Sequence, residues 1–312
     1  MAVYTLLSRG DIAELLALYD VGGLQAFSAI SAGIENSNYA ITTDDGEFVL
    51  TIFEHHAPDE VRSFVRLGRH LGNRNLRVPS PIEDQAGCWL HTLKHKPAIL
   101  CQRFPGSHPE MVTEQHCAAI GRELAEFHLA SADLTDPRQD ERGYDWWQSV
   151  APDLSADLSP DDRQLLNDEL LFQRHQRQRW LALPHGWIHA DLFHDNALFD
   201  GTDLTAILDL YNACEGAWLY DLAIVANDWC VATDGVTLDE ARVSALTSAY
   251  RAVRNIDAEE WGMWTVVLRG AALRFWLSRL LAARLARSRC EELPAHKQPV
   301  EYRNRLLSHR AG

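Results

Sequence analysis

The chain of 312 residues is 46% hydrophobic and 23% charged, which is enough for a sizeable core in one large domain or two ordinary ones. Its 44 acidic and 29 basic residues give a formal charge of −15, which argues against nucleic acid or an anionic membrane surface as the main partner. Acidic residues interrupt the most apolar stretch and the N-terminus lacks a signal-peptide pattern, so we expect a cytoplasmic protein with no membrane span.

The first hundred residues contain β-prone runs separated by turns. The runs 29–41 and 47–53 flank an Asp45-Gly46 turn and predict an antiparallel hairpin. Apolar residues then recur at helical spacing, which predicts a helix over 58–71.

Two more strands are predicted before the character of the chain changes. They cover 89–93 and 98–104, and Pro105-Gly106 follows as a hinge. We therefore expect a small, mostly β lobe over 1–104 and a larger, mostly helical lobe over 105–312, with ligands held in a cleft.

The second part of the chain is predicted to be mainly helical. Apolar residues lie on one helical face over 120–127 and again over 243–253. A short β-like island spans 187–210 between these helices. The final helical pattern, 259–287, is expected to break near Gly270.

The cysteines and histidines give little sign of a metal site. Six cysteines contain no CxxC pair, and fourteen histidines contain no HExxH motif. Buried free thiols are the simpler interpretation.

The β island carries the residues that suggest chemistry. It contains HADLFHDN, which places Asp191 and Asn196 in one short loop, and Asp209 follows thirteen residues after Asn196. Phosphoryl transfer from ATP needs a carboxylate to accept the hydroxyl proton and hard oxygen ligands for Mg²⁺. These three residues supply those chemical types, although a loop whose Asp and Asn residues merely cap turns is the alternative interpretation.

Nearly the whole chain resembles the aminoglycoside phosphotransferase-like, or protein-kinase-like, superfamily. Within it, the chain is most similar to the homoserine kinases of that fold. The segments that carry the resemblance are GIENSNY at 33–39, FVLTIFE at 48–54, WIHADLFHDN at 187–196, LYDLAIVANDWC at 219–230 and RFWLSRL at 274–280. It implies an α+β, two-lobed fold with a small antiparallel β lobe and a larger α-helical lobe, and an enzyme that uses ATP and Mg²⁺ to phosphorylate L-homoserine.

The resemblance also assigns roles to individual residues. Asp191 is expected to be the catalytic base, Asn196 and Asp209 the metal ligands, and His189 a structural residue of the catalytic loop.

Nucleotide contacts are expected from the first lobe. The segment from Gln102 to Phe104 is expected to meet adenine through backbone groups. A turn before the 47–53 strand is expected to cap phosphate, although a purely structural, Asx-rich hairpin turn is the alternative. Its candidate residues are Gly33, Asn36, Ser37 and Asn38.

The sequence departs from the general kinase pattern at two places in this lobe. Gly33 stands alone where protein kinases have a glycine-rich loop, and Thr51 occupies the strand position where a lysine or arginine is usual. The group that replaces this cation is not identified by the sequence.

A homoserine site needs a cation for the carboxylate and an acceptor for the ammonium group. Arg274 is the candidate carboxylate clamp, and Arg279 is the reserve. Asp228, Tyr211 and Asn212 are candidates for the amino end.

Each substrate residue also has a structural interpretation. Asp228 could cap or pair within its helix, and Arg274 could be the ion-pair partner of Asp221 or Asp228. Trp229 and Trp276 could form an aromatic wall beside an ammonium group, but core positions are the simpler interpretation.

Two other functions stay open. One is a kinase of another small alcohol, such as choline, ethanolamine or an aminoglycoside, because the acidic composition suits cationic substrates. The other is a nucleotide-binding regulator without transfer activity, supported only by Thr51. A protein kinase is disfavoured because no long activation segment follows Asp209. The oligomeric state is not indicated.

Overall fold

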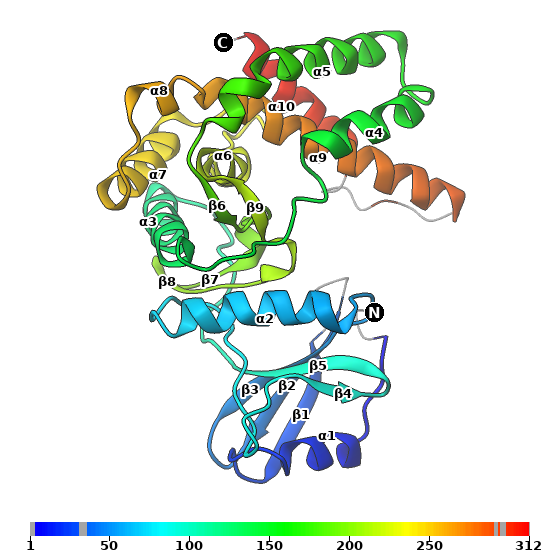
Figure 1. Cartoon of the computed structure of the whole chain (residues 1–312), viewed down its shortest axis with the longest axis vertical. Coiled ribbons are helices and arrows are strands. Elements are labelled where there is room, and N and C mark those ends of the chain that lie inside the picture. The colour runs from blue at the N-terminus through cyan, green and yellow to red at the C-terminus, as the bar shows by residue number, and fades with distance from the viewer. Residues whose placement is uncertain (1–3, 31–35, 290–292, 294–297, 312) are drawn as a thin grey trace. The chain divides into compact units, whose positions relative to one another are not determined.

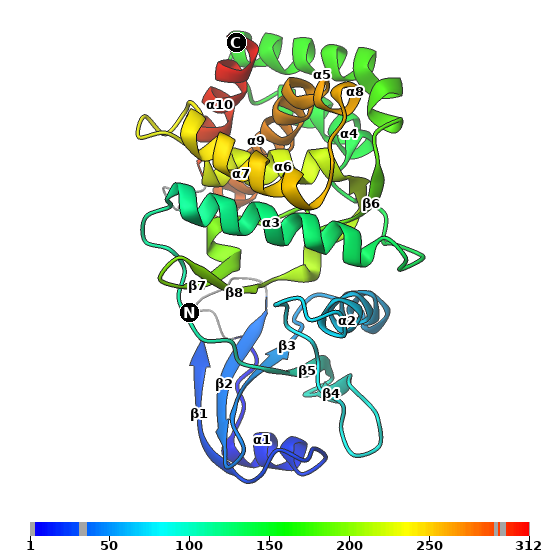
Figure 2. The same ribbon diagram turned by 90° about the vertical axis from the view of Figure 1, so that its left-hand side faces the viewer.

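A computed structural model of the protein describes residues 4–30, 36–289, 293 and 298–311. The chain forms two compact units, one of residues 1–108 with 197–211 and the other of residues 109–196 with 212–312. Figures 1 and 2 show their elements. The predicted division after residue 104 assigned everything later to one lobe, and the structure differs by grouping 197–211 with the first unit.

The first unit is built on a five-stranded antiparallel sheet in the order β1-β2-β3-β5-β4. Its strands are β1 (Leu24–Ile30), β2 (Ser37–Thr43), β3 (Glu47–Ile52), β4 (His91–Leu93) and β5 (Lys96–Gln102). Two helices accompany them, α1 (Arg9–Leu16) and α2 (Pro58–Gly72). The hairpin turn at Asp45-Gly46 and the helix predicted over 58–71 are confirmed. The 29–41 run, expected as one strand of that hairpin, comprises the end of β1 and most of β2, with undescribed residues between them.

The two faces of this sheet bury separate cores because strand side chains alternate. Leu50 and Ile52 of β3 pack in one core with α1, while Ile99 of β5 packs with Val61 and Phe64 of α2 in the other. Figure 1 shows α1 and α2 on opposite sides of the sheet. The sheet therefore lies between two hydrophobic cores.

A hairpin from the middle of the chain joins the first unit. It consists of β7 (Ala197–Asp200) and β8 (Asp203–Ile207). Ser107 and Phe199 exchange two backbone hydrogen bonds of 3.0 and 2.9 Å, and the Ile207 N–H donates to the Arg77 carbonyl at 2.7 Å. Gly106, with φ +104°, is needed here because a Cβ would lie 2.5 Å from the Phe199 carbonyl oxygen. These bonds explain the grouping that the sequence did not predict.

The second unit is mainly helical, with a two-stranded antiparallel ribbon. Its helices are α3 (Glu114–Ser131), α4 (Tyr144–Ser155), α5 (Pro160–Leu181), α6 (Trp218–Trp229), α7 (Glu240–Val253), α8 (Ala258–Trp261), α9 (Trp264–Ser288) and α10 (Pro299–Ala311). The ribbon pairs β6 (His185–Ile188) with β9 (Cys214–Ala217). Helix α6 is almost wholly buried and packs on α9 and against β6. Two short 3-10 helices are also present. They are η1 (His194–Asn196), between β6 and β7, and η2 (Leu210–Asn212), between β8 and β9.

The predicted break near Gly270 is wrong, because α9 runs unbroken through that position. A Cβ at Gly270 would lie 2.8 Å from the Trp180 ring, so the glycine serves helix packing. The chain instead turns at Gly262 and Met263, between α8 and α9.

Membrane-spanning helices, metal-binding clusters and cysteines can be judged for the described residues. Among the described residues, no helix is long and apolar enough to cross a membrane, and no cluster of three or more His, Cys, Asp or Glu side chains is arranged for a metal. Four of the five described cysteines are buried free thiols, and Cys88 is exposed. Cys290 lies outside the described residues.

Candidate active site

The loop after β6 is held by a buried carboxylate on α6. Asp221 is fully buried and accepts hydrogen bonds from the backbone N–H groups of His189 at 2.7 Å and Ala190 at 2.9 Å. Ala190 has φ +64°, a left-handed conformation that costs free energy in any residue with a Cβ. Asp221 therefore fixes the backbone turn that leads into Asp191. His189 takes part in this loop packing, as predicted, and is fully buried.

A chain of buried side chains continues from Asp221. His128 of α3 bonds Asp221 through Nε2 at 3.0 Å and the Tyr250 hydroxyl through Nδ1 at 2.7 Å. Burial lowers the pKa of His128 more than Asp221 raises it. Burial raises the pKa of Asp221, but its interactions with His128 and His189 together outweigh burial and lower that pKa overall. A neutral imidazole therefore donates from Nε2 to an ionised Asp221 and accepts from Tyr250 at Nδ1.

The carboxylate of Asp191 has two neighbours in the second unit. The Asn212 side-chain amide donates to Oδ2 at 3.2 Å, and Arg274 Nη1 lies 3.6 Å from Oδ1. The Asp191 side chain is 26% exposed, so it remains accessible to a reactant. Asn212, predicted as a substrate contact, thus orients the predicted base.

The two predicted metal ligands offer oxygen atoms that suit a hard cation. Asn196 donates from Nδ2 to the Asp191 carbonyl at 2.9 Å, which leaves its amide oxygen as the remaining ligand atom. Asp209 belongs to the first unit, lies two residues after the end of β8 and has φ +59°. An amide oxygen and a carboxylate fit Mg²⁺ better than zinc or copper.

Arg274 is the most unusual charged group of the second unit. It is 3% exposed, yet its guanidinium donates no hydrogen bond to any described residue. Burial lowers its pKa, but the acidic groups around it, Asp191 first among them, together outweigh this and raise the pKa overall. The structural alternative named Asp221 or Asp228 as its partner, and both are wrong because the ion pair is with Asp191.

Asp228 is engaged by the catalytic loop. Its Oδ2 accepts from the backbone N–H of His194 at 2.7 Å and is bonded to His194 Nδ1 at 2.8 Å. Asp228 raises the pKa of His194, and these bonds tie η1 to the end of α6. The observed role of Asp228 is structural, and it differs from the expected cap within its own helix.

Tyr211 packs inside the first unit. Its ring centroid lies 5.0 Å from that of Phe53, 5.7 Å from Phe64 and 6.1 Å from His56. The aromatic contacts fix the segment that follows Asp209, and the predicted substrate contact of Tyr211 stays a prediction.

The predicted phosphate turn is only partly described. Gly33 lies outside the described residues. The Ser37 hydroxyl accepts from the N–H groups of Tyr4 and Thr5 and donates to Glu54, so its side chain has no capacity left for phosphate. The expected phosphate contact therefore does not extend to the Ser37 hydroxyl.

Asn36 and Asn38, on either side of Ser37, make different hydrogen bonds. Asn36 is buried and its Oδ1 accepts from the Glu54 N–H at 3.3 Å. Thr51, at the position where a lysine was expected, donates its hydroxyl to Asn38 Oδ1 at 2.7 Å. This bond orients the Asn38 amide with its NH₂ group as the remaining donor.

A lysine does occur in this unit, at a place that the sequence did not single out. Lys96 of β5 pairs with the carboxylate of Glu54, whose side chain is 2% exposed. Burial raises the pKa of Glu54, but hydrogen bonds from Lys96, Ser37 and Thr5 outweigh this and lower it overall. Lys96 and Glu54 anchor the N-terminal segment to the sheet, through Thr5 and Ser37.

The remaining predicted positions have simple environments. Gln102 ends β5 and is exposed, and Phe104 is half-buried just beyond it. Arg279, the reserve clamp, pairs with Glu301 of α10. Trp229 and Trp276 are buried, which supports the core interpretation.

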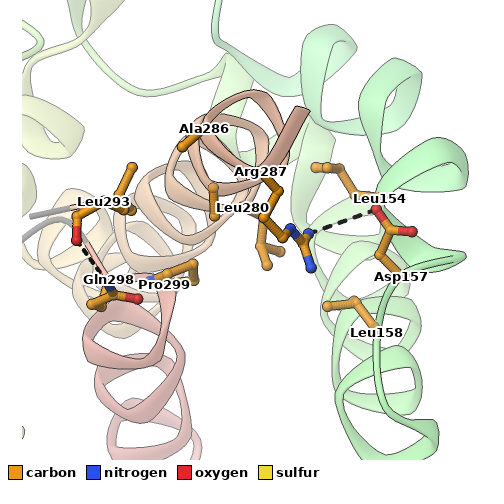
Figure 3. A pocket seen from close by; sticks show the side chains of 10 residues that line it. Leu154, Asp157, Leu158, Leu280, Ala286, Arg287, Leu293, Gln298 and Pro299 are labelled. Atoms are coloured by element: carbon orange, nitrogen blue, oxygen red, sulfur yellow. Dashed lines mark hydrogen bonds and ion pairs between the residues drawn. The ribbon is translucent and has the colours of Figure 1, made fainter. Parts of the chain in front are cut away.

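A separate pocket lies elsewhere in the second unit. Figure 3 shows it between α4, the C-terminal part of α9 and the start of α10. Leu154, Leu280 and Pro299 line it, together with Arg287, which lies 3.9 Å from Asp157. None of the predicted site residues lines this pocket.

Comparison of the sequence with known proteins identifies the family. The chain belongs to the phosphotransferase enzyme family, whose model matches residues 26–256. Homoserine kinase from Methylobacillus flagellatus is 41% identical over 309 residues, covering 99% of this chain and 95% of the relative. Homoserine kinase from a Janthinobacterium species is 39% identical over 298 residues, covering 95% and 92%. The predicted family is thus confirmed.

Solved structures share the fold. The amicoumacin kinase hAmiN, determined with AMP-PNP, Ca²⁺ and its ligand, has a TM-score of 0.73 at 16% identity and covers 98% of this chain and 94% of its own. A microcompartment-associated aminopropanol kinase has a TM-score of 0.63 at 17% identity, covering 97% and 95%. The predicted two-lobed, protein-kinase-like α+β fold is confirmed.

The sequence interpretation missed some residues that shape this site. It treated Asp221 only as a possible partner of Arg274, although the residue lies in the quoted LYDLAIVANDWC segment. It did not consider His128 or Tyr250, because no local pattern distinguishes a buried histidine on an apolar helix face from ordinary core.

Proposed function

We propose that this protein transfers the terminal phosphoryl group of ATP to the hydroxyl of L-homoserine, giving O-phospho-L-homoserine for threonine biosynthesis. Full-length similarity to homoserine kinases supports the reaction. The observation that carries the substrate is the buried guanidinium of Arg274, which has no hydrogen-bond partner among the described residues and lies 3.6 Å from Asp191. We further propose a cytoplasmic location and Mg²⁺ as the metal.

In this proposal, Asp191 accepts the proton of the substrate hydroxyl as that oxygen attacks the phosphorus atom. Asn212 fixes the orientation of the carboxylate through its bond to Oδ2. Asp221 fixes the backbone on which Asp191 stands. Direct in-line transfer needs this placement more than any covalent chemistry by the protein.

Asn196 and Asp209 are the proposed holders of Mg²⁺. The ion supplies neutralisation of phosphate charge when it is bound. The bond from Asn196 Nδ2 to the Asp191 carbonyl turns the amide oxygen outward as a ligand. We also propose that the nucleotide is bound by the first unit. Its adenine would contact Gln102 and Phe104, and its phosphates would contact Gly33, Asn36 and Asn38.

Arg274 is the proposed clamp for the substrate carboxylate. A guanidinium presents a planar set of donors that fits a carboxylate with two parallel hydrogen bonds. L-Homoserine carries its hydroxyl and carboxylate on one short carbon chain, which suits the short separation of Asp191 and Arg274. A buried cation with open donors favours an anionic substrate group.

A kinase of a cationic alcohol is the second candidate. The net charge of −15 favours cationic substrates, and an aminopropanol kinase shares the fold. Choline, ethanolamine and aminopropanol lack a carboxylate, however, and would leave the guanidinium donors of Arg274 without a hydrogen-bond acceptor. The guanidinium therefore favours homoserine.

The test is ADP release by the purified protein with ATP and Mg²⁺. The panel contains L-homoserine, D-homoserine, L-serine, choline, ethanolamine and an aminoglycoside. We expect turnover confined to L-homoserine, and a loss of turnover when Arg274→Gln is assayed. Turnover on an amino alcohol instead of L-homoserine would reject the substrate, and ATP binding without turnover on any member would favour a regulator.

A further inference from the structure

Several side chains of the second unit, Trp218, Ser278 and Tyr302 among them, have a buried polar atom without a hydrogen-bond partner among its described residues. Two others act on each other electrostatically. One is the guanidinium of Arg274, and the other is the Tyr220 hydroxyl on α6. Both residues are 3% exposed. Buried polar groups are nearly always paired, and an open donor costs most when it belongs to a charged group. The open guanidinium of Arg274, which lies 3.6 Å from the predicted base, and the Tyr220 hydroxyl therefore indicate a bound ligand.

The two groups act on each other electrostatically. Apart from burial, the charge of Arg274 is the strongest influence on the Tyr220 pKa, which burial raises well above the usual range. Helices α6 and α9 pack together, which brings Tyr220 and Arg274 into the same region. Asp191 joins them through its 3.6 Å ion pair with Arg274.

The segment that leads into α4 reaches the same region. The Arg138 carbonyl accepts from the Glu215 N–H of β9 at 2.6 Å. Four residues into α4, the Trp147 ring lies 6.5 Å from that of Tyr220, and a Cβ at Gly270 would meet Trp147 at 3.3 Å. Gly270 is one helical turn before Arg274 on α9. The residues between Arg138 and Trp147 are thus fixed at both ends beside Arg274.

Asp140 is the half-buried carboxylate of this segment. Its Oδ1 accepts from the Arg142 N–H at 2.8 Å in a tight turn, and its Oδ2 has no partner among the described residues. Burial raises the pKa of Asp140, while the N–H of Arg142 and the charge of Arg274 lower it. After Asp191, Asp140 is the carboxylate with the strongest effect on Arg274.

We propose that Asp140 and Tyr220 complete an amino-acid headgroup site around Arg274. The α-ammonium group binds Asp140 Oδ2, and the α-carboxylate binds the Arg274 guanidinium and the Tyr220 hydroxyl. The substrate side chain then extends to Asp191. This inference rests on the proposed homoserine kinase activity and names the residues that select a zwitterion.

The proposal replaces Asp228 as the acceptor for the ammonium group. His194 ties Asp228 to the loop through Oδ2, whereas the charge of Asp140 acts on Arg274 itself. Asp140 offers an open oxygen, and a bound ammonium would balance its buried charge.

Three alcohols separate the roles. L-Homoserine carries ammonium and carboxylate, 4-hydroxybutyrate lacks the ammonium, and 3-amino-1-propanol lacks the carboxylate. We expect Asp140→Asn to raise KM for L-homoserine about tenfold or more and to change KM for 4-hydroxybutyrate less than about twofold. We expect Tyr220→Phe to raise KM about threefold or more for both carboxylate substrates and to spare 3-amino-1-propanol. An alcohol that is not phosphorylated is measured as a competitive inhibitor of L-homoserine.

The variants have matched controls. Asn at position 140 keeps an oxygen that accepts from Arg142, so the turn is preserved. Glu141→Gln removes the adjacent exposed carboxylate, and Tyr19→Phe removes another buried hydroxyl that has no partner, in the first unit. Both controls should leave the KM or inhibition constant of each of the three alcohols unchanged. Thermal unfolding of each variant checks its fold.

Two failures are distinguishable. If the wild-type protein does not act on L-homoserine, the proposed function fails and this inference fails with it. If the wild-type protein does act on L-homoserine but Asp140→Asn raises KM equally for L-homoserine and 4-hydroxybutyrate, only the inference is overturned. Equal losses for all three alcohols in Tyr220→Phe would likewise reject the role of Tyr220.

Discussion

The Asp221 carboxylate accepts a hydrogen bond of 2.9 Å from the N–H of Ala190, whose φ is +64°. One buried charge thus holds a non-glycine residue in a left-handed conformation immediately before Asp191. The hydrogen bonds to Asp221 offset the cost of the strained backbone.

Ala190→Gly should leave the free energy of unfolding unchanged or raise it by up to about 1 kcal/mol, because glycine adopts a positive φ without strain. Ala190→Val should lower it by about 2 kcal/mol or more, because a branched side chain fits neither the backbone nor the buried site. Urea unfolding measures both. Ala223→Gly, in the buried helix α6, is the matched control and should lose about 1 kcal/mol.

Asp191→Asn should lower kcat by about a thousandfold, because the amide cannot accept the hydroxyl proton. The free energy of unfolding should change little, since Asp191 is partly exposed and makes few contacts. Steady-state ADP release and urea unfolding test the two expectations. Asp200→Asn, at the exposed end of β7, is the control. Retained turnover in Asp191→Asn would reject the assigned base.

Stability should fall as the pH decreases from 6.5 toward 5. The pKa of His128 is lowered by burial, so below 6.5 the unfolded chain takes up a proton that the folded chain does not bind. The slope for one such histidine approaches about 1.4 kcal/mol per pH unit. His309, whose pKa burial lowers to about 4, contributes with the same sign. The raised pKa of His194 has the opposite sign and stabilises the folded state below its folded pKa, and this contribution is lost above it.

His128→Gln should therefore flatten this pH dependence, whereas His175→Gln, on the exposed face of α5, should not. Tryptophan fluorescence is a suitable probe because nine of the ten tryptophans lie in the second unit with His128. An unchanged slope in His128→Gln would show that His128 is not neutral in the folded state.

Gly270→Ala should destabilise the second unit by about 1 to 3 kcal/mol, because its Cβ would lie 2.8 Å from the Trp180 ring. Helix propensity alone would predict the reverse sign. Unfolding followed by tryptophan fluorescence decides between the two. Ser278→Ala, two turns further along α9, is the helical control.

Local patterns in the sequence predicted the elements that depend on local contacts. The helix expected over 58–71 is observed as Pro58–Gly72, since Pro58 at its first turn and its amphipathic face are both visible in the sequence. Gly270 misled the prediction, because the Trp180 ring that requires it comes from a distant helix. The placement of β7 and β8 with the first unit was missed for the same reason.

In the candidate site, too, the residues of a local motif were predicted and the contacts between distant segments were not. Asp191 and Asn196 were predicted as a pair because they occupy one short motif, and the hydrogen bond of the Asn196 amide to the Asp191 carbonyl reflects that proximity. The ion pair of Arg274 with Asp191 joins a helix and a loop far apart in the sequence, and no spacing rule predicts it. Asp140 and Tyr220 were missed because their significance lies in open hydrogen-bonding capacity, which depends on tertiary packing.

The grouping of residues 197–211 with residues 1–108 means that the chain passes between the units three times, after residues 108, 196 and 211. Residues 1–108 expressed alone would lack the β7–β8 hairpin, and with it the partners of Ser107 and Arg77. Conversely, a protease that cuts once after residue 108 would leave two fragments that hold each other through these bonds. The two units are therefore a poor choice for separate expression, and fragment complementation is the expected behaviour of the nicked protein.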